Sequence, residues 1–275
     1  MLTTEPAIAV LAGIVQGIVE WLPVSSQGNL SLFLTAIGTT PEVALQLALF
    51  LQLGTTISAI SYYRGELTAA VQRLPSWQPR TAFQEGNALV SYLVVASFAT
   101  GLVGIPLYVF AVDIAGNLTG GVFISVIGLL LIITGVLQLG TESGPSGTKQ
   151  QPTFVDACLV GAAQGIAILP GISRSGMTTS TLLFRSYEPT TAFTLSFLLS
   201  IPASIGAAVL TLVDAGGIPG ISPFAAAIAL VTSGIVGYAA IDVLLRIVDR
   251  VPFWGICFGL GGIAIVGGGI VTVVG

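Results

Sequence analysis

The chain contains no histidine among its 275 residues. This absence excludes a histidine general base, a histidine-ligated zinc site and a phosphohistidine intermediate. Charge is also scarce, because Asp, Glu, Lys and Arg make up only 7% of the chain, and the net charge of −4 argues against a nucleic-acid partner. The two cysteines, Cys158 and Cys257, both lie in apolar runs. Neither a disulfide framework nor a cysteine metal site is therefore indicated.

Apolar residues are abundant: 54% of the chain is hydrophobic, and the mean hydropathy is +0.98. These values predict an all-α polytopic membrane protein with little mass outside the bilayer. The 35 glycines suit close helix packing and broken helices in lipid. The first apolar run, residues 7–22, contains Gln16 and Glu20, so we expect no cleavable signal peptide there.

Six apolar segments are long enough to cross a bilayer as helices. Two further units, at about 6–37 and 154–184, each consist of two short apolar pieces around a polar break. A short–break–short unit predicts a re-entrant helix pair, because neither half spans the membrane alone. The six predicted spans cover about 41–63, 87–110, 118–140, 190–213, 221–247 and 252–274.

The order of these units repeats once along the chain. The tripeptide Gln-Gly-Ile at 16–18 returns at 164–166, and residues after it recur at the same constant spacing. We therefore predict one membrane domain, 1–275, built from a first repeat at about 1–140, a polar loop at 141–153 and a second repeat at about 154–275. The further recurring pairs are Pro41 and Pro189, Ala44 and Ala192, Leu47 and Leu195, Leu51 and Leu199, and Ala59 and Ala207.

The basic residues predict the orientation of the chain in the membrane. Three full spans per repeat is an odd number, so the second repeat must be inverted relative to the first. If the loop after the first span is cytoplasmic, nearly all basic residues fall on that side. The opposite loops carry Glu42, Asp113 and Asp214, and both termini lie outside. The basic residues assigned to the cytoplasmic side are Arg64, Arg73, Arg80, Lys149, Arg185, Arg246 and Arg250.

The second break, at 170–178, holds the remaining arginine. A guanidinium such as Arg174 at membrane depth costs about 2.5–3.5 kcal/mol, so a functional role is expected. Pro170 and Gly171 end one helix and Ser173 caps the next, whose free N–H groups attract anions. The stretch predicts a phosphate-binding loop. The alternative is a helix break whose arginine pairs with an acid for packing alone. The other predicted binding residues of this break are Ser173, Ser175 and Thr178.

The first break is predicted to meet the second near the midplane. Glu20 is then a buried partner for Arg174, a general base, or a ligand for a divalent cation such as Mg²⁺ or Ca²⁺ held with a phosphate. These roles are compatible. Ser26 is the candidate nucleophile, although a serine after a proline break is equally typical of a helix N-cap. The residues that the first break contributes are Gln16, Glu20, Ser25, Ser26 and Asn29.

Both breaks carry motifs of a known family. The run from Gln16 to Ser26 and the run from Pro170 to Thr178 resemble the two motifs of the undecaprenyl-diphosphate phosphatase family, the bacitracin-resistance type of integral membrane phosphatase. The resemblance covers nearly the whole chain. It implies six transmembrane helices with two re-entrant helix pairs in inverted-topology repeats. It also implies hydrolysis of undecaprenyl (polyprenyl) diphosphate to the monophosphate and phosphate, at the outer face of the cell membrane.

The resemblance also implies roles for single residues. Glu20 matches the second acid of the first motif, Ser26 the proposed nucleophile, and Arg174 the phosphate-binding loop. Gln16 is a permitted alternative at its position. The family usually carries histidine where this chain has Asn29. Either that histidine is dispensable, or water and Glu20 replace it, or this subgroup has changed the reaction.

Two functions from different classes follow. The first is a phosphatase that recycles a lipid carrier for cell-envelope glycan synthesis. The second is a flippase or transporter of polyprenyl phosphate or another anion, which needs Arg174 but no nucleophile. A scaffold without chemistry leaves Glu20 and Arg174 unexplained. The predicted partners are the polyprenyl diphosphate lipid, the membrane and, as a possibility left open, a second copy of the chain.

Overall fold

A computed structural model describes residues 5–84, 86–142, 147–247 and 252–274. All the regular secondary structure within these residues is helical. One isolated β-bridge pairs Lys149 with Tyr187. Six helices are long and apolar enough to cross a membrane, so the chain is an all-α, multi-pass membrane protein. These are α3 (Pro41–Tyr62), α5 (Ala88–Asn117), α6 (Gly120–Glu142), α9 (Pro189–Asp214), α10 (Pro223–Ile247) and α11 (Phe253–Val274).

All six predicted spans are confirmed as helices, with two differences in detail. The helix α5 continues beyond the predicted end at 110 because its polar residues near the end bond within the helix: Asn117 Nδ2 donates to Asp113 O at 2.7 Å. The loop after α3 contains a further helix, α4 (Arg64–Arg73), whose residues are all at least partly exposed. Two short 3₁₀ turns, η1 (Leu74–Ser76) and η2 (Pro79–Thr81), follow it.

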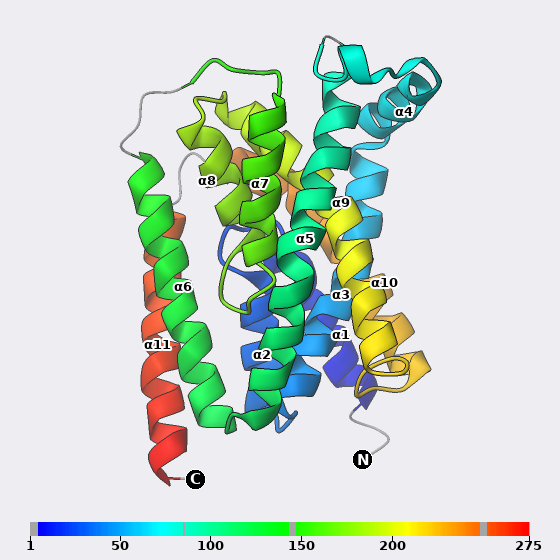
Figure 1. Ribbon diagram of the computed structural model, residues 1–275. Helices are drawn as coiled ribbons and strands as arrows, with labels where there is room; N and C mark the ends of the chain where they lie inside the picture. The colour runs from blue at the N-terminus through cyan, green and yellow to red at the C-terminus, as the bar shows by residue number, and fades with distance from the viewer. Residues whose placement is uncertain (1–4, 85, 143–146, 248–251, 275) are drawn as a thin grey trace.

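Two pairs of short helices occupy the predicted re-entrant positions. The first pair is α1 (Glu5–Val19) with α2 (Ser26–Ala36), and the second is α7 (Phe154–Ile166) with α8 (Arg174–Phe184). The pairs start from opposite ends of the bundle, and each turns back inside it (Figure 1). Their breaks therefore come together in the interior, far from both ends of the long helices.

Glycines let the short pairs approach the long helices closely. A Cβ on Gly17 of α1 would lie 2.7 Å from Val236 Cβ of α10, and a Cβ on Gly165 of α7 would lie 2.7 Å from Val103 Cβ of α5. These two glycines belong to the two copies of the repeated tripeptide. Both copies therefore need a glycine at this position, because α1 packs on α10 in the same way as α7 packs on α5.

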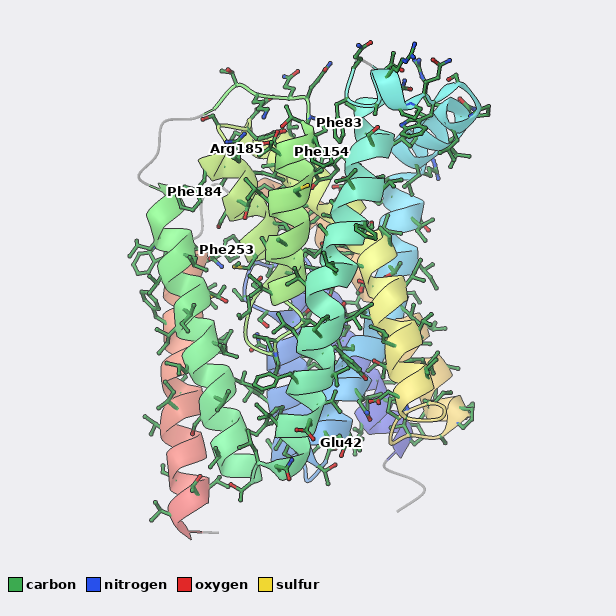
Figure 2. The ribbon with its side chains drawn as sticks, viewed as in Figure 1. Glu42, Phe83, Phe154, Phe184, Arg185 and Phe253 are labelled. Carbon is green, nitrogen blue, oxygen red and sulfur yellow. The ribbon has the colours of Figure 1, made fainter. Side chains whose placement is uncertain are left out.

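Basic residues of α4 and of the loop after α8 lie at one end of the bundle. Arg185 lies at the end that also carries α4, whereas Glu42 lies at the opposite end (Figure 2). The start of α1 and the end of α11 lie at the Glu42 end (Figure 1). This arrangement agrees with the predicted grouping of basic residues. Arg250 lies outside the described residues.

Candidate active site

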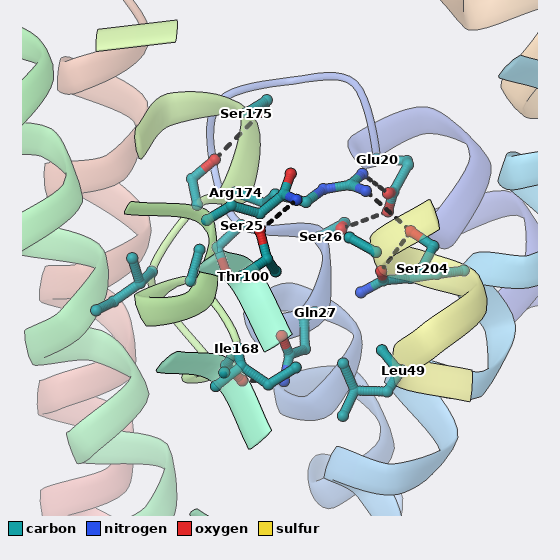
Figure 3. A pocket seen from close by; sticks show the side chains of 18 of the residues that line it. Glu20, Ser25, Ser26, Gln27, Leu49, Thr100, Ile168, Arg174, Ser175 and Ser204 are labelled. Atoms are coloured by element: carbon teal, nitrogen blue, oxygen red, sulfur yellow. Dashed lines mark hydrogen bonds and ion pairs between the residues drawn. The ribbon is translucent and has the colours of Figure 1, made fainter. Parts of the chain in front are cut away.

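A pocket lies where the two breaks meet. Its walls come from both breaks and from α3, α5, α7 and α9, and Figure 3 shows the polar side chains that face it. A buried, partly polar pocket between long helices is the expected place for a ligand in a bundle of this kind. The predicted site residues that line it are Glu20, Ser25, Ser26, Ser173, Arg174 and Ser175.

Ser25 of the first break makes one of the links between the two breaks. Ser25 adopts a left-handed backbone (φ 61°), which is uncommon for a residue with a side chain. Its Oγ accepts hydrogen bonds from Gly28 N at 3.2 Å and from Gly171 N of the second break at 3.1 Å. Ser25 is therefore the N-cap of α2 and also a link between the halves. The N-cap role considered for Ser26 belongs to Ser25.

Arg174, the first residue of α8, forms an ion pair with Glu20 across the pocket. Its Nη1 also donates to Ser200 O at 3.2 Å and to Ser204 Oγ at 2.9 Å. The Arg174 side chain is 17% exposed, whereas that of Glu20 is 1% exposed. The guanidinium is thus held on one side by α9 and by the carboxylate, and it still faces the pocket.

The second carboxylate oxygen of Glu20 holds the candidate nucleophile. Glu20 Oε2 accepts from Ser26 Oγ at 2.6 Å and from Gln16 Nε2 at 2.6 Å. A hydroxyl in direct contact with a buried carboxylate is the geometry of a nucleophile beside its general base. Packing and function are compatible here, because Glu20 pairs with Arg174 through one oxygen and contacts Ser26 through the other.

The start of α8 provides the predicted anion site. Ser173 caps the helix, since its Oγ accepts from Gly176 N at 3.1 Å. Ser175 Oγ lies 3.3 Å from Ser173 Oγ and donates to Leu22 O at 3.2 Å. The first N–H groups of α8 have no partner within the helix, and they carry its positive dipole end. An anion at this end of the pocket therefore meets both the helix terminus and Arg174.

Three predicted binding residues lie behind the pocket wall instead of lining it. Gln16 is fully buried and contacts Glu20. Asn29 Nδ2 donates to Val24 O at 2.7 Å and to Ser25 O at 2.9 Å, so it braces the break. Thr178 Oγ1 donates to Arg174 O at 2.9 Å and contacts Ser196 Oγ. Each of them supports a residue that does line the pocket.

Sequence reasoning missed the polar wall contributed by the long helices and α7. Ser204 Oγ contacts Arg174 and donates to Gln52 Oε1 at 3.1 Å. Gln164 Nε2 donates to Thr100 Oγ1 at 3.2 Å. All four of these residues line the pocket. Gln164 had a signal in the sequence, because it repeats Gln16.

The residues of the pocket do not form a cage for a resident divalent cation. Within the part of the chain that the structure describes, no three His, Cys, Asp or Glu side chains gather as ligands. Glu20 is the single carboxylate of the pocket, and both of its oxygens already contact Arg174, Ser26 or Gln16. Mg²⁺ and Ca²⁺ require about six or more oxygen ligands. A cation would depend on oxygens of the ligand and on water, so no catalytic step is assigned to it.

Comparison with known proteins places the chain among membrane phosphatases. The family described as bacitracin resistance protein BacA matches residues 9–263. An undecaprenyl-diphosphatase of Haloarcula marismortui is 44% identical over 266 residues, covering 96% of this chain and 98% of that protein. An undecaprenyl-diphosphatase of Methanococcoides burtonii is 38% identical over 261 residues, covering 92% and 94% of the two chains. One of Methanopyrus kandleri is 36% identical over 263 residues, covering 94% of each.

Proposed function

We propose that this chain, which belongs to the BacA family of bacitracin resistance proteins, hydrolyses undecaprenyl diphosphate to undecaprenyl monophosphate and phosphate. The relatives are named for this reaction. The observation that carries the proposal is the contact of Ser26 and Arg174 with the two oxygens of the Glu20 carboxylate inside one pocket. Nucleophile, base and phosphate ligand are thereby within reach of one phosphorus atom.

The terminal phosphate binds at Arg174 and the N-terminus of α8. Ser26 Oγ attacks this phosphorus while Glu20 takes the hydroxyl proton. The bond from phosphorus to the bridging oxygen breaks, and undecaprenyl monophosphate leaves with the electron pair. Water then releases phosphate from the serine. In the second version of the mechanism, Glu20 takes the proton from a water that attacks the phosphorus directly. In both versions of the mechanism, Arg174 and backbone N–H groups stabilise the charge that develops on the phosphate oxygens. Such electrostatic stabilisation usually supplies most of the rate enhancement in phosphoryl transfer.

The orientation in the membrane belongs to the same proposal. Both termini lie outside, α4 lies in the cytoplasm, and the two short helix pairs enter the membrane from opposite faces as inverted repeats. The grouping of α4 with Arg185 at one end of the bundle supports this orientation through the positive-inside rule. The diphosphate reaches the pocket from the outer face, and the isoprenoid tail stays in the lipid. A homodimer remains a prediction.

The names of the relatives favour hydrolysis over the transport alternative. A flippase for an anionic lipid would use Arg174 but would not need the hydroxyl of Ser26. Under serine catalysis, replacement of Ser26 by alanine separates the two functions, because it removes the nucleophile and leaves the anion site in place.

The direct test measures phosphate release from undecaprenyl diphosphate by detergent-purified protein. We expect release by the wild type and its loss in Arg174→Ala. The matched control is Arg64→Ala, because Arg64 is an exposed residue of α4 at the end of the bundle. Absence of release from folded wild-type protein, with or without Mg²⁺ or Ca²⁺, would overturn the proposal. Lipid flipping in reconstituted vesicles would then be measured.

A further inference from the structure

The repeated tripeptide of the sequence has two glutamines, and only the first, Gln16, contacts a residue of the proposed mechanism. Gln164 stands in the second copy where Gln16 stands in the first. The two copies differ four residues later, where the first has Glu20 and the second has Ile168. Gln164 therefore has no carboxylate of its own to hold. It lies one turn before the second break and is 3% exposed.

The amide of Gln164 is oriented by its neighbours. Its Nε2 donates to Thr100 Oγ1 at 3.2 Å and to Leu199 O at 3.4 Å. Because a backbone carbonyl can only accept, the nitrogen must face α9 and the amide oxygen must point the other way. The next carbonyl of α9, that of Ser200, accepts from Arg174 Nη1. The Gln164 amide and the Arg174 guanidinium are thus anchored on adjacent residues of the same helix.

The remaining atom, Gln164 Oε1, is buried and has no hydrogen-bond partner among the described residues. Burying an amide oxygen without a donor costs about 1–3 kcal/mol. Four other side chains share this condition, but Gln164 alone among them lines the pocket. Its oxygen can therefore be satisfied by a donor that enters the pocket.

We infer that Gln164 Oε1 accepts a hydrogen bond from an O–H group in the bound state of the pocket, and that this bond positions the reacting group beside Arg174. A fully ionised diphosphate offers only acceptors, so two O–H sources remain. One is the water that hydrolysis consumes, and the other is the protonated terminal phosphate. This inference rests on the proposed phosphatase activity and adds Gln164 to it as a specificity and positioning residue.

The test compares two variants that break the same internal contact. Both Gln164→Met and Thr100→Val remove the bond between Gln164 and Thr100, but only Gln164→Met removes the acceptor. We expect kcat/KM to fall about tenfold or more in Gln164→Met and much less in Thr100→Val. Gln164→Asn, which keeps the amide but withdraws it by one methylene, should lie between them. The control is Gln46→Met, because Gln46 is also buried but lies outside the pocket, where its Nε2 donates to Asp214 Oδ2 at 2.9 Å.

The kinetic pattern distinguishes the two sources of the O–H group. If the donor is water, kcat falls while KM and inhibition by inorganic phosphate stay as in the wild type. If the donor is the protonated phosphate, KM of the wild type rises as pH increases through the second phosphate pKa, about 6, and Gln164→Met loses that dependence.

Comparable loss in Gln164→Met and Thr100→Val would overturn the inference, since it would assign Gln164 to the packing of α5 on α7. Wild-type kinetics in folded Gln164→Met would overturn it as well. A wild-type protein that releases no phosphate would instead contradict the proposed function, so the two failures are distinguishable.

Discussion

Arg174 and Glu20 form an ion pair between residues 154 positions apart in the sequence. Each of them lies at a helix break, so the pair joins the two halves of the chain at the pocket. The second carboxylate oxygen contacts Ser26, and the second guanidinium nitrogen contacts α9. The pair therefore organises the site, and both residues line the pocket that a ligand would enter.

Removal of one partner of this pair is expected to destabilise the protein. Glu20→Gln leaves Arg174 without its counter-ion, and loss of one partner of a buried ion pair typically costs about 3–5 kcal/mol. Thermal unfolding in detergent would measure the loss. We expect Glu20→Gln combined with Arg174→Met to be more stable than Glu20→Gln alone, because no unpaired charge remains. Equal stability of the single variant and the wild type would show that the pair is not structurally important.

Variants of the two adjacent serines of the first break should have different effects, Ser26→Ala on catalysis and Ser25→Ala on stability. Ser26→Ala removes the hydroxyl that contacts Glu20, and under serine catalysis we expect kcat to fall about 10³-fold or more with little change in unfolding temperature. Ser25→Ala removes the cap of α2 and the bond to Gly171, so it should lower stability by about 0.5–2 kcal/mol.

Trapping of a phosphorylated intermediate supplies a second readout for Ser26. Acid quenching of the wild type with β-labelled diphosphate should yield label on the protein, and Ser26→Ala should yield none. Substantial turnover by Ser26→Ala would favour direct attack by water.

Asn29 acts in this structure as a donor to the backbone of the break. Its amide bonds Val24 O and Ser25 O and does not line the pocket. A histidine ring N–H can make one such bond, which gives a physical reason why either residue suits the position. We expect Asn29→His to retain most of its activity and Asn29→Ala to lose activity together with stability. A large gain of kcat in Asn29→His would instead indicate a proton-transfer role.

Asp156, at the start of α7, should make stability depend on pH. Its buried carboxylate accepts bonds from Thr153, Tyr187, Arg185 and Lys149. Burial raises the pKa of Asp156, but these hydrogen bonds outweigh burial and hold the pKa well below its ordinary value. The stabilisation is then complete above the unfolded pKa, about 3.9, and it is lost as pH falls below that value.

The comparison of Asp156→Asn with the wild type measures this contribution. We expect the variant to unfold at a lower temperature at neutral pH, with a difference that stays constant down to about pH 5 and narrows below about pH 4. A difference that is the same at pH 7 and pH 3 would contradict the assignment.

Divalent cations are expected to act through the substrate. Because the pocket holds one carboxylate with both oxygens engaged, the protein alone should bind Mg²⁺ or Ca²⁺ weakly. Calorimetric titration should therefore detect cation binding only when a diphosphate is present. Tight binding of the cation to the lipid-free protein, lost in Glu20→Gln, would show that Glu20 is a metal ligand in its own right.

Much of the fold follows from local features of the sequence. The six spans could be predicted because the length and apolarity of a segment are properties of that segment alone. The two breaks could be predicted from Pro23 and Pro170 with the polar residues around them. Glu20 and Arg174 stand out for the same reason, since charges at membrane depth are costly wherever the chain carries them.

The lining of the pocket depends on contacts between distant segments. Three residues that were predicted to face the ligand lie behind the pocket wall. Gln16 holds Glu20, Asn29 holds the first break, and Thr178 bonds the first turn of α8. The wall that faces Arg174 comes instead from Gln52 and Ser204 on α3 and α9. Spacing along one helix cannot predict which of its neighbours will cover it.

The sequence by itself thus determined the spans, the breaks, the family and the charged pair, because each of these is encoded in a local pattern or in the energy of a single side chain in lipid. Only the tertiary structure decided that Ser25 and not Ser26 caps α2, that Glu20 contacts both Arg174 and Ser26, and that Gln164 faces the pocket. These facts depend on how the two halves pack against each other. A small rotation of one helix breaks a hydrogen bond between side chains, and no pattern along the sequence specifies that rotation.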